Sequence, residues 1–162
     1  MHMLLPSLKR LSIYDCPRLE SFPNRGLPSN ISYMTLINCS RLMDSLKGAL
    51  GGNPCLRSLW IGKMDAECFP NEGLLPLSLT SLAISHCRNL KELDYKGLHQ
   101  LSSLKTLSLC LCSNLQCLPE EGLPKSVSYL EIGECPLLKE RCQKEGGKDW
   151  KKIAHIVTVK IW

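Results

Sequence analysis

The sequence predicts an α/β solenoid with a curved, parallel β-sheet on its concave face and mostly irregular loops and short helical turns on its convex side. Two observations predict this fold class. One line of apolar residues is written six times along the 162-residue chain, and alternate copies start 48 residues apart. Turn motifs that contain glycine separate the copies with the same two-repeat rhythm. A regular period of about 20 to 50 residues is typical of proteins built from stacked structural units.

The repeated line places apolar residues at offsets 0, 3 and 5 and a cysteine or methionine at offset 8, with starts near positions 8, 31, 56, 79, 104 and 127. Side chains alternate along a strand, so both apolar residues of the L-x-L part share one face. One unit cannot bury that face alone, and we expect the units to stack about 4.8 Å apart over a continuous core. The pattern L-x-x-L-x-L-x-x-C is the signature of leucine-rich repeats. The sequence therefore predicts a leucine-rich-repeat solenoid.

Five of the ten cysteines stand at the same place, just after the strand of a repeat. They are Cys16, Cys39, Cys87, Cys112 and Cys135, with Met64 at this place in the third repeat. Free cysteine behaves as a small, well-buried apolar residue, so we predict a structural ladder of reduced, inward-facing thiols. Disulfides between successive repeats are the alternative in an oxidising setting. Cys110, Cys112 and Cys117 have a metal-like spacing, but strand alternation points Cys110 and Cys112 in opposite directions, and no metal is expected.

The turns between the copies take two forms. Odd repeats close with FPNRGLP (22–28), FPNEGLLP (69–76) and LPEEGLP (118–124), and even repeats close with LKGAL (46–50) and YKGLH (95–99). Glycine suits a turn position with positive φ, and proline ends one segment before the next strand begins. These motifs are turns between units and not linkers, so we assign residues 1–138 to six leucine-rich repeats.

Residues 139–162 are predicted to form a carboxy-terminal cap. Trp150, Ile153 and Ile156 recur at intervals of three, which places them on one face if this stretch is helical. That face is expected to close the apolar core against the sixth strand. Residues 136–162 also supply +4 of the formal net charge of +5, which we interpret as a solvated surface of the cap.

Composition and motif content argue against several classes of function. The chain is 44% hydrophobic and 22% charged, as in globular proteins, and no apolar run is long enough for membrane insertion. Basic and aromatic residues do not interleave along the repeats, so no nucleic-acid partner is predicted. The four histidines lie outside any nucleophile or metal motif, and the phosphate-loop pattern G-x-x-x-x-G-K-[ST] does not occur. We expect a chain that is not an enzyme and holds no cofactor.

The candidate partner-binding residues are strand residues that point away from the core. They form columns across the predicted concave face, and most of them are Ser, Thr, Ala or Gly. Larger or charged residues interrupt these columns and make up the candidate site: Arg10, Tyr14, Tyr33, Ile37, Trp60, Tyr129 and Glu131. Exposed aromatic side chains near charges are typical of interface anchors. They would either bind a foreign protein or be covered by a neighbouring domain of the same protein.

The repeats also resemble a known family. The line L-x-x-L-x-I-x-x-C-x-x-L, followed by F-P or L-P and then G-L-P, resembles the carboxy-terminal repeats of plant nucleotide-binding, leucine-rich-repeat disease-resistance proteins, and is closest to the coiled-coil class. The ending CPLLKERCQKEGGKDWKKIAHI (135–156) is similar to the stereotyped close of those receptors. Val157 departs from the pattern, because the family usually has proline there.

The resemblance implies a protein-interaction module of an intracellular plant immune receptor. Its partners would be a pathogen effector or a guarded host protein, together with the upstream nucleotide-binding domain of the same receptor. The repeats would help to hold that domain inactive. ATP or ADP would bind only in that upstream domain. We expect a cytoplasmic location, with nuclear or membrane-associated placement of the full receptor as alternatives. The chain would be the terminal piece of a longer receptor or a truncated product.

Two alternatives from other classes stay open. One is the substrate-binding repeat tract of an F-box ubiquitin-ligase adaptor, which shares the line L-x-x-L-x-L-x-x-C. Such repeats usually follow the cysteine with an I-T-D-like segment, whereas here the first repeat continues with Leu19-Glu20-Ser21-Phe22-Pro23. The other is a secreted leucine-rich-repeat inhibitor of a microbial enzyme. It would need a signal peptide and repeats of the form N-x-L-x-G-x-I-P, and neither appears in this sequence.

Overall fold

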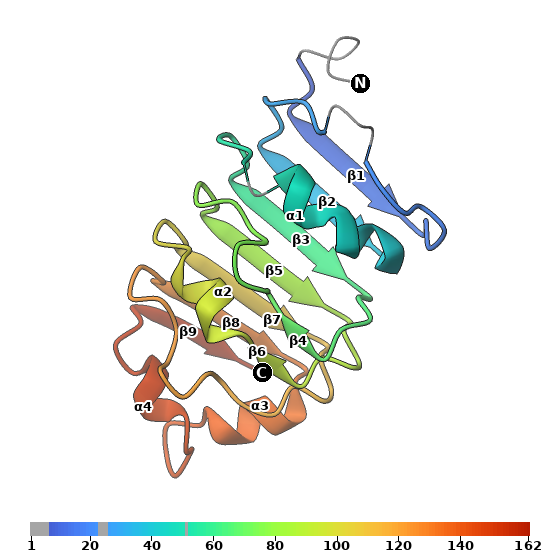
Figure 1. The fold of residues 1–162 in the computed structure, drawn as a ribbon. Helices are drawn as coiled ribbons and strands as arrows, with labels where there is room; N and C mark the ends of the chain where they lie inside the picture. Colours follow the sequence, from blue (N-terminus) through green and yellow to red (C-terminus); the bar gives the residue numbers. More distant parts are fainter. Residues whose placement is uncertain (1–6, 23–25, 51) are drawn as a thin grey trace.

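The computed structural model describes residues 7–22, 26–50 and 52–162, so residues 23–25 of the first turn motif lie outside the described residues. Its main sheet has seven parallel strands in the order β1-β2-β3-β5-β7-β8-β9 (Figure 1). The strands are β1 (Arg10–Tyr14), β2 (Tyr33–Ile37), β3 (Ser58–Gly62), β5 (Ser81–Ser85), β7 (Thr106–Cys110), β8 (Tyr129–Gly133) and β9 (Thr158–Ile161). The predicted leucine-rich-repeat solenoid is therefore confirmed.

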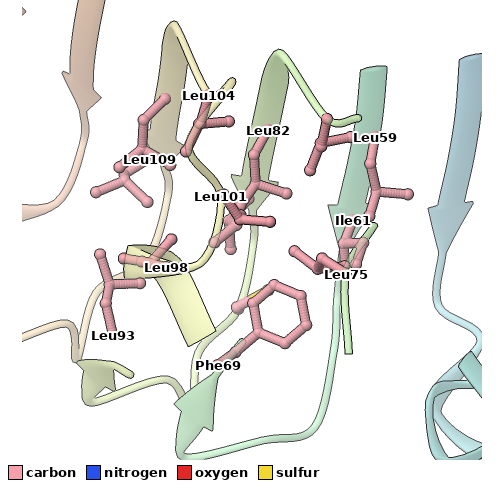
Figure 2. Packing of buried hydrophobic residues seen from close by; sticks show 14 of the residues in the cluster. Leu59, Ile61, Phe69, Leu75, Leu82, Leu93, Leu98, Leu101, Leu104 and Leu109 are labelled. Carbon is pink, nitrogen blue, oxygen red and sulfur yellow. The ribbon is translucent and has the colours of Figure 1, made fainter. Parts of the chain in front are cut away.

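The strands pair without any shift in register. Leu59 on β3 lies opposite Met34 on β2 and Leu82 on β5, and Trp60 lies opposite Thr35 and Ala83. Both leucines are fully buried, while Trp60 is 45% exposed. Figure 2 shows Leu59, Ile61, Leu82 and Leu109 pointing into one continuous apolar core, together with residues from the convex turns. The inward and outward sides of the strands are thus the ones that the alternation predicts.

The convex side follows the two-repeat rhythm of the turn motifs. In the even repeats, LKGAL forms helix α1 (Leu46–Leu50), which continues the 3₁₀ helix η1 (Ser40–Ser45), and YKGLH forms helix α2 (Tyr95–His99). Two short strands, β4 (Cys68–Phe69) and β6 (Glu92–Leu93), pair in parallel on this side (Figure 1). Gly97 of α2 packs so closely that a Cβ there would collide with the carbonyl of Pro70. The glycine therefore lets an even repeat pack directly against the odd repeat before it.

One residue after each strand turns the chain toward the core. This residue has φ between 50° and 56° in all six copies, although glycine occurs in none of them. The six residues, which we call the αL rim, are Asp15, Asn38, Lys63, His86, Leu111 and Glu134. The backbone N–H of each of the first five donates to the carbonyl at the end of the next strand, as Asn38 does to Gly62 at 3.0 Å and His86 to Cys110 at 3.0 Å, and that of Glu134 donates to Trp162 just after β9. The turn brings the cysteine that follows it to face inward.

The cysteine ladder forms behind this rim as predicted, except at its first position. All ten cysteines are free, and Cys39, Cys87, Cys112 and Cys135 are buried, as is Met64. Each rung thiol donates to the carbonyl two residues earlier, over distances such as 3.2 Å from Cys87 Sγ to Ser85 O. Cys16, however, is only half-buried. The prediction of a buried thiol was wrong there, because no described repeat packs on the outer side of the first one.

The same exposure affects other residues of the first repeat. Leu11 and Ile13 are half-buried, whereas their counterparts on the next strand, Met34 and Leu36, are 2% and 1% exposed. Leu19, which continues the apolar line, is 39% exposed, while Leu42 at the same place in the second repeat is fully buried. A rung of a solenoid is buried only between two neighbours.

The cap differs from the expected helical face. It contains helix α3 (Pro136–Arg141), which begins before residue 139, and helix α4 (Trp150–Ile153). Ile153 and Ile156 are buried, but Ile156 lies beyond the end of α4, and Trp150 is half-buried. The cap then adds strand β9, which pairs with β8 and places Val159 opposite Leu130. The sheet therefore has a seventh strand that the sequence analysis did not predict.

A buried carboxylate fastens the cap to the fifth repeat. Asp149 is fully buried, and its oxygens accept hydrogen bonds from Arg141 Nε at 3.1 Å, Arg141 Nη2 at 3.0 Å and the backbone N–H of Leu118 at 2.9 Å. Lys152 Nζ lies 3.1 Å from Asp149 Oδ1. Burial alone would raise the pKa of Asp149, but the bonds from Arg141, Leu118 and Lys152 outweigh it and hold this pKa below its ordinary value.

Candidate functional site

The candidate site is the concave face of the main sheet. Three residues of each five-residue strand, and two of the four-residue β9, point outward, because inward and outward side chains alternate. On β5 and β7 these outward residues are small, namely Ser81, Ala83, Ser85, Thr106, Ser108 and Cys110. The larger candidate residues therefore fall into two groups on either side of these two strands. We call them the first group, on β1–β3, and the second group, on β8 and β9.

The first group presents three exposed aromatic rings. The exposed fractions are 53% for Tyr14, 47% for Tyr33 and 45% for Trp60. The guanidinium carbon of Arg10 lies 4.5 Å from the centre of the Tyr33 ring, which is a cation–π contact between adjacent strands. Ile37 is half-buried and lies over Gly62, where a Cβ would come within 2.6 Å of Ile37 Cδ1. All five of these candidate residues therefore share one surface.

Trp60 is held in place by a neighbour that the sequence analysis did not single out. Its indole Nε1 donates to Ser85 Oγ on β5 over 2.8 Å. The ring consequently leans from β3 toward β5 and toward the αL rim, since Ser85 precedes His86. Its donor is satisfied while nearly half of its surface stays open. A ring fixed in this way loses little conformational freedom when a partner covers it.

The second group contains Tyr129 and Glu131, both half-buried, with two residues from the cap. Ser108 Oγ donates to Glu131 Oε2 at 2.8 Å. Lys160 lies opposite Glu131 in the register of β8 and β9, and its Nζ is 5.7 Å from the centre of the Tyr129 ring. Trp162 is 49% exposed, and its ring covers Gly133, where a Cβ would lie 2.5 Å from Trp162 Cζ2.

Sequence reasoning missed Lys160 and Trp162 because it missed β9. A signal was present: Ile156, Val159 and Ile161 keep the offsets 0, 3 and 5 of the repeated line. This seventh copy starts 29 residues after Val127, outside the 23- and 25-residue spacing of the other copies. The extended loop reflects the two cap helices between β8 and β9.

The side chains of this face are suited to noncovalent contacts with another protein. The outward-pointing residues of the main sheet's described strands include one thiol, Cys110, whose Sγ lies 3.6 Å from Ser108 Oγ. Burial raises the pKa of that thiol, so the reactive thiolate is disfavoured. Within residues 7–22, 26–50 and 52–162, no group of three or more His, Cys, Asp or Glu side chains is arranged to hold a metal ion. The face instead offers aromatic area, hydrogen-bonding hydroxyls and two cations.

The chain is similar in sequence to plant proteins. It is 41% identical over 182 aligned residues to the Arabidopsis thaliana protein At3g14460, named as a disease resistance protein, and the match covers 96% of this chain but 13% of the relative. It is also 26% identical to RF45 and to RDL5 of the same plant, likewise named as disease resistance proteins, over 98% of this chain and 15% of each relative. The chain thus spans about one seventh of the length of these relatives. No protein-family model matches it.

A solved structure supports the fold. The leucine-rich repeat domain of the type III effector XopL superposes with a TM-score of 0.50 at 22% identity, covering 82% of this chain and 54% of that domain. At this identity the likeness concerns the fold alone. In the part of the chain that the structure describes, no helix is both long and apolar enough to cross a bilayer.

Proposed function

Taking as a premise that this chain is a leucine-rich-repeat tract similar to plant disease resistance proteins, we propose that it is the protein-interaction module of a plant immune receptor. The observation that carries the proposal is the concave face. Four aromatic side chains there are between 45% and 53% exposed, namely Tyr14, Tyr33, Trp60 and Trp162. Large exposed rings on a rigid sheet are costly for a free surface and typical of a protein interface.

The module would recognise a pathogen effector, or a host protein that an effector modifies. Before recognition, the same tract would help to hold a nucleotide-binding domain of the receptor in its inactive state. In that arrangement ATP or ADP would bind to the nucleotide-binding domain, and the repeats would act through protein contacts without catalysis. Such a receptor would work inside the plant cell.

Capture of partners by the purified chain tests this proposal. The wild-type chain, a Tyr33→Ala/Trp60→Ala double variant and a Leu77→Ala control would be immobilised and exposed to extracts of healthy and infected plant tissue. Leu77 is 62% exposed and lies between the third turn motif and β5, outside the concave columns, so it controls for loss of an exposed apolar side chain. We expect at least one protein that the wild type and the control retain and the double variant loses.

The outcome against the proposal is equally specific. If the double variant keeps its fold, as circular dichroism would show, and captures the same proteins as the wild type, the concave face is not the interaction surface. A wild-type chain that captures nothing above the background of a denatured chain would also contradict the proposed function.

A further inference from the structure

A small basic cavity opens at the αL rim between the third and fourth repeats. It has a volume of about 280 Å³ and is lined by Lys63, Met64, Asp65, His86, Arg88 and Asn89. Lys63 and His86 occupy the same αL position in consecutive repeats, so they lie side by side along the rim. The cavity therefore spans the third and fourth repeats, the same two repeats that the Trp60–Ser85 hydrogen bond joins.

Within the described part of the chain, the cations of this cavity form no ion pair. Two exposed cations elsewhere on the repeats form ion pairs, Arg41 with Glu20 and Lys91 with Glu67. Lys63 and Arg88 form no ion pair with any residue that the structure describes. The one carboxylate of the cavity, Asp65, accepts a hydrogen bond from Asn89 Nδ2 at 2.7 Å. The formal charges of Lys63, Arg88 and Asp65 sum to +1.

Trp60 lies on the concave face, and its hydrogen-bond acceptor Ser85 is adjacent in sequence to a residue that lines this cavity. Its ring leans over Ser85, which immediately precedes His86, and Lys63 follows Trp60 by three residues. A segment that covers the exposed indole and continues across the rim would meet the cavity within a few residues. Its apolar side chain would lie on Trp60, and an acidic side chain would enter between Lys63 and Arg88. Such an arrangement combines an aromatic anchor with charge complementarity at the edge of the contact.

We propose that this face recognises a protein segment in which an aliphatic residue is followed closely by Asp or Glu, the aliphatic group packing on Trp60 and the carboxylate binding in the rim cavity. The inference rests on the proposed function, because it names the chemistry of the partner at the same surface. It also assigns Lys63 and Arg88 as specificity-determining residues, although neither points from a strand of the concave sheet.

Two hexapeptides that differ only in charge provide the probe. One has the sequence Leu-Asp-Glu-Leu-Asp-Glu and the other Leu-Asn-Gln-Leu-Asn-Gln, both acetylated and amidated. Each would be titrated into the ¹⁵N-labelled chain while the Trp60 indole N–H and the His86 amide are followed by NMR. We expect the acidic peptide to shift both signals and to bind about five-fold more tightly than the neutral peptide, as two exposed ion pairs would give.

Charge reversal at the cavity is the decisive comparison. A Lys63→Glu/Arg88→Glu variant should lose the preference for the acidic peptide, while a Lys105→Glu/Lys125→Glu control should keep it. The control makes the same charge change at two exposed lysines that lie before β7 and before β8, at the opposite ends of the strands. Glutamate is compatible with the αL position, because Glu134 occupies it in the sixth repeat with φ of 50°.

The outcomes separate this inference from the proposed function. Equal affinity for the two peptides, shifts confined to other signals, or no shift with either peptide would overturn the inference. If the charge-reversed variant also keeps the acidic preference, the cavity has no role in it. If partner capture still depends on Tyr33 and Trp60, the proposed function then stands without this inference. If neither the acidic-peptide preference nor this partner capture is observed, the proposed function is contradicted as well.

Discussion

Replacing Asp149 should detach the cap from the repeats. The carboxylate is fully buried and accepts bonds from Arg141, Leu118 and Lys152, while Arg141 is 34% exposed and Lys152 14% exposed. In Asp149→Ala, the Leu118 N–H and two partly buried cations lose their acceptor together. Breaking one side of a buried ion pair costs about 3–5 kcal/mol. Because both cations reach some solvent, we expect the lower end of that range.

Thermal unfolding followed by circular dichroism measures this loss. A destabilisation of about 3 kcal/mol corresponds to a fall in Tm of roughly 6–12 °C for a domain of this size. Glu120→Gln is the matched control, because Glu120 Oε2 also lies near Lys152 Nζ, at 3.9 Å, but its side chain is 92% exposed. Loss of that surface pair should cost at most about 0.5 kcal/mol.

The pH dependence follows from the direction of the pKa shift. The pKa of Asp149 is lower in the folded chain than in the unfolded chain, so the unfolded state binds its proton first as the pH falls. The stability that Asp149 contributes is therefore complete above the unfolded pKa of about 3.9 and is lost as the pH falls further. The gap in Tm between wild type and Asp149→Ala should be constant near neutral pH and shrink below about pH 4. A variant that melts with the wild type at neutral pH, or a gap that widens in acid, would refute this account of the cap.

Two further predictions concern the rim and the ladder behind it. Leu111→Asn should stabilise the fold by about 0.5–1 kcal/mol, because Leu111 has a φ of 56° and asparagine tolerates that conformation better. Leu111 is 36% exposed, and Asn38 already occupies the same position in the second repeat. A lower Tm for the variant would contradict this. Native thiol labelling should modify Cys16 well before the buried Cys87 and Cys142, and it should reach Cys142 only on unfolding, since burial raises its pKa to about 12. Equal labelling rates at Cys16 and Cys87 would show that the ladder is open along its length.

The repeated line predicts the fold because its signal is periodic and redundant. Six copies of the offsets 0, 3 and 5 determine the strands, their inward faces and their unshifted pairing. The short helices α1 and α2 coincide with LKGAL and YKGLH, because the turn motifs differ consistently between odd and even repeats. Each of these features depends on local spacing, which a sequence displays directly.

Features that depend on one side chain meeting another far along the chain were not predictable in this way. The buried Asp149 contradicts the usual exposure of aspartate, and its partner Leu118 is 31 residues away. The orientation of Trp60 depends on a hydrogen bond to Ser85 across 25 residues, so alternation gives its side of the sheet but not its direction on that side. Cys16 would be buried only if another repeat packed on the outer side of the first one, and the repeated line by itself does not show whether one does.

The central claim is that the concave face binds protein partners while the residues beneath it hold the fold. Leu59 and Trp60 test it most directly, because they are adjacent on β3 and are 0% and 45% exposed. Leu59→Ala should cost about 2–5 kcal/mol of stability, as truncation of a buried leucine does. Trp60→Ala should melt close to the wild type and weaken binding of a captured partner by about 2 kcal/mol or more. The assignment of the two faces is contradicted if Trp60→Ala unfolds the chain. It is also contradicted if Trp60→Ala binds the partner as tightly as the wild type does while Leu59→Ala leaves the stability unchanged.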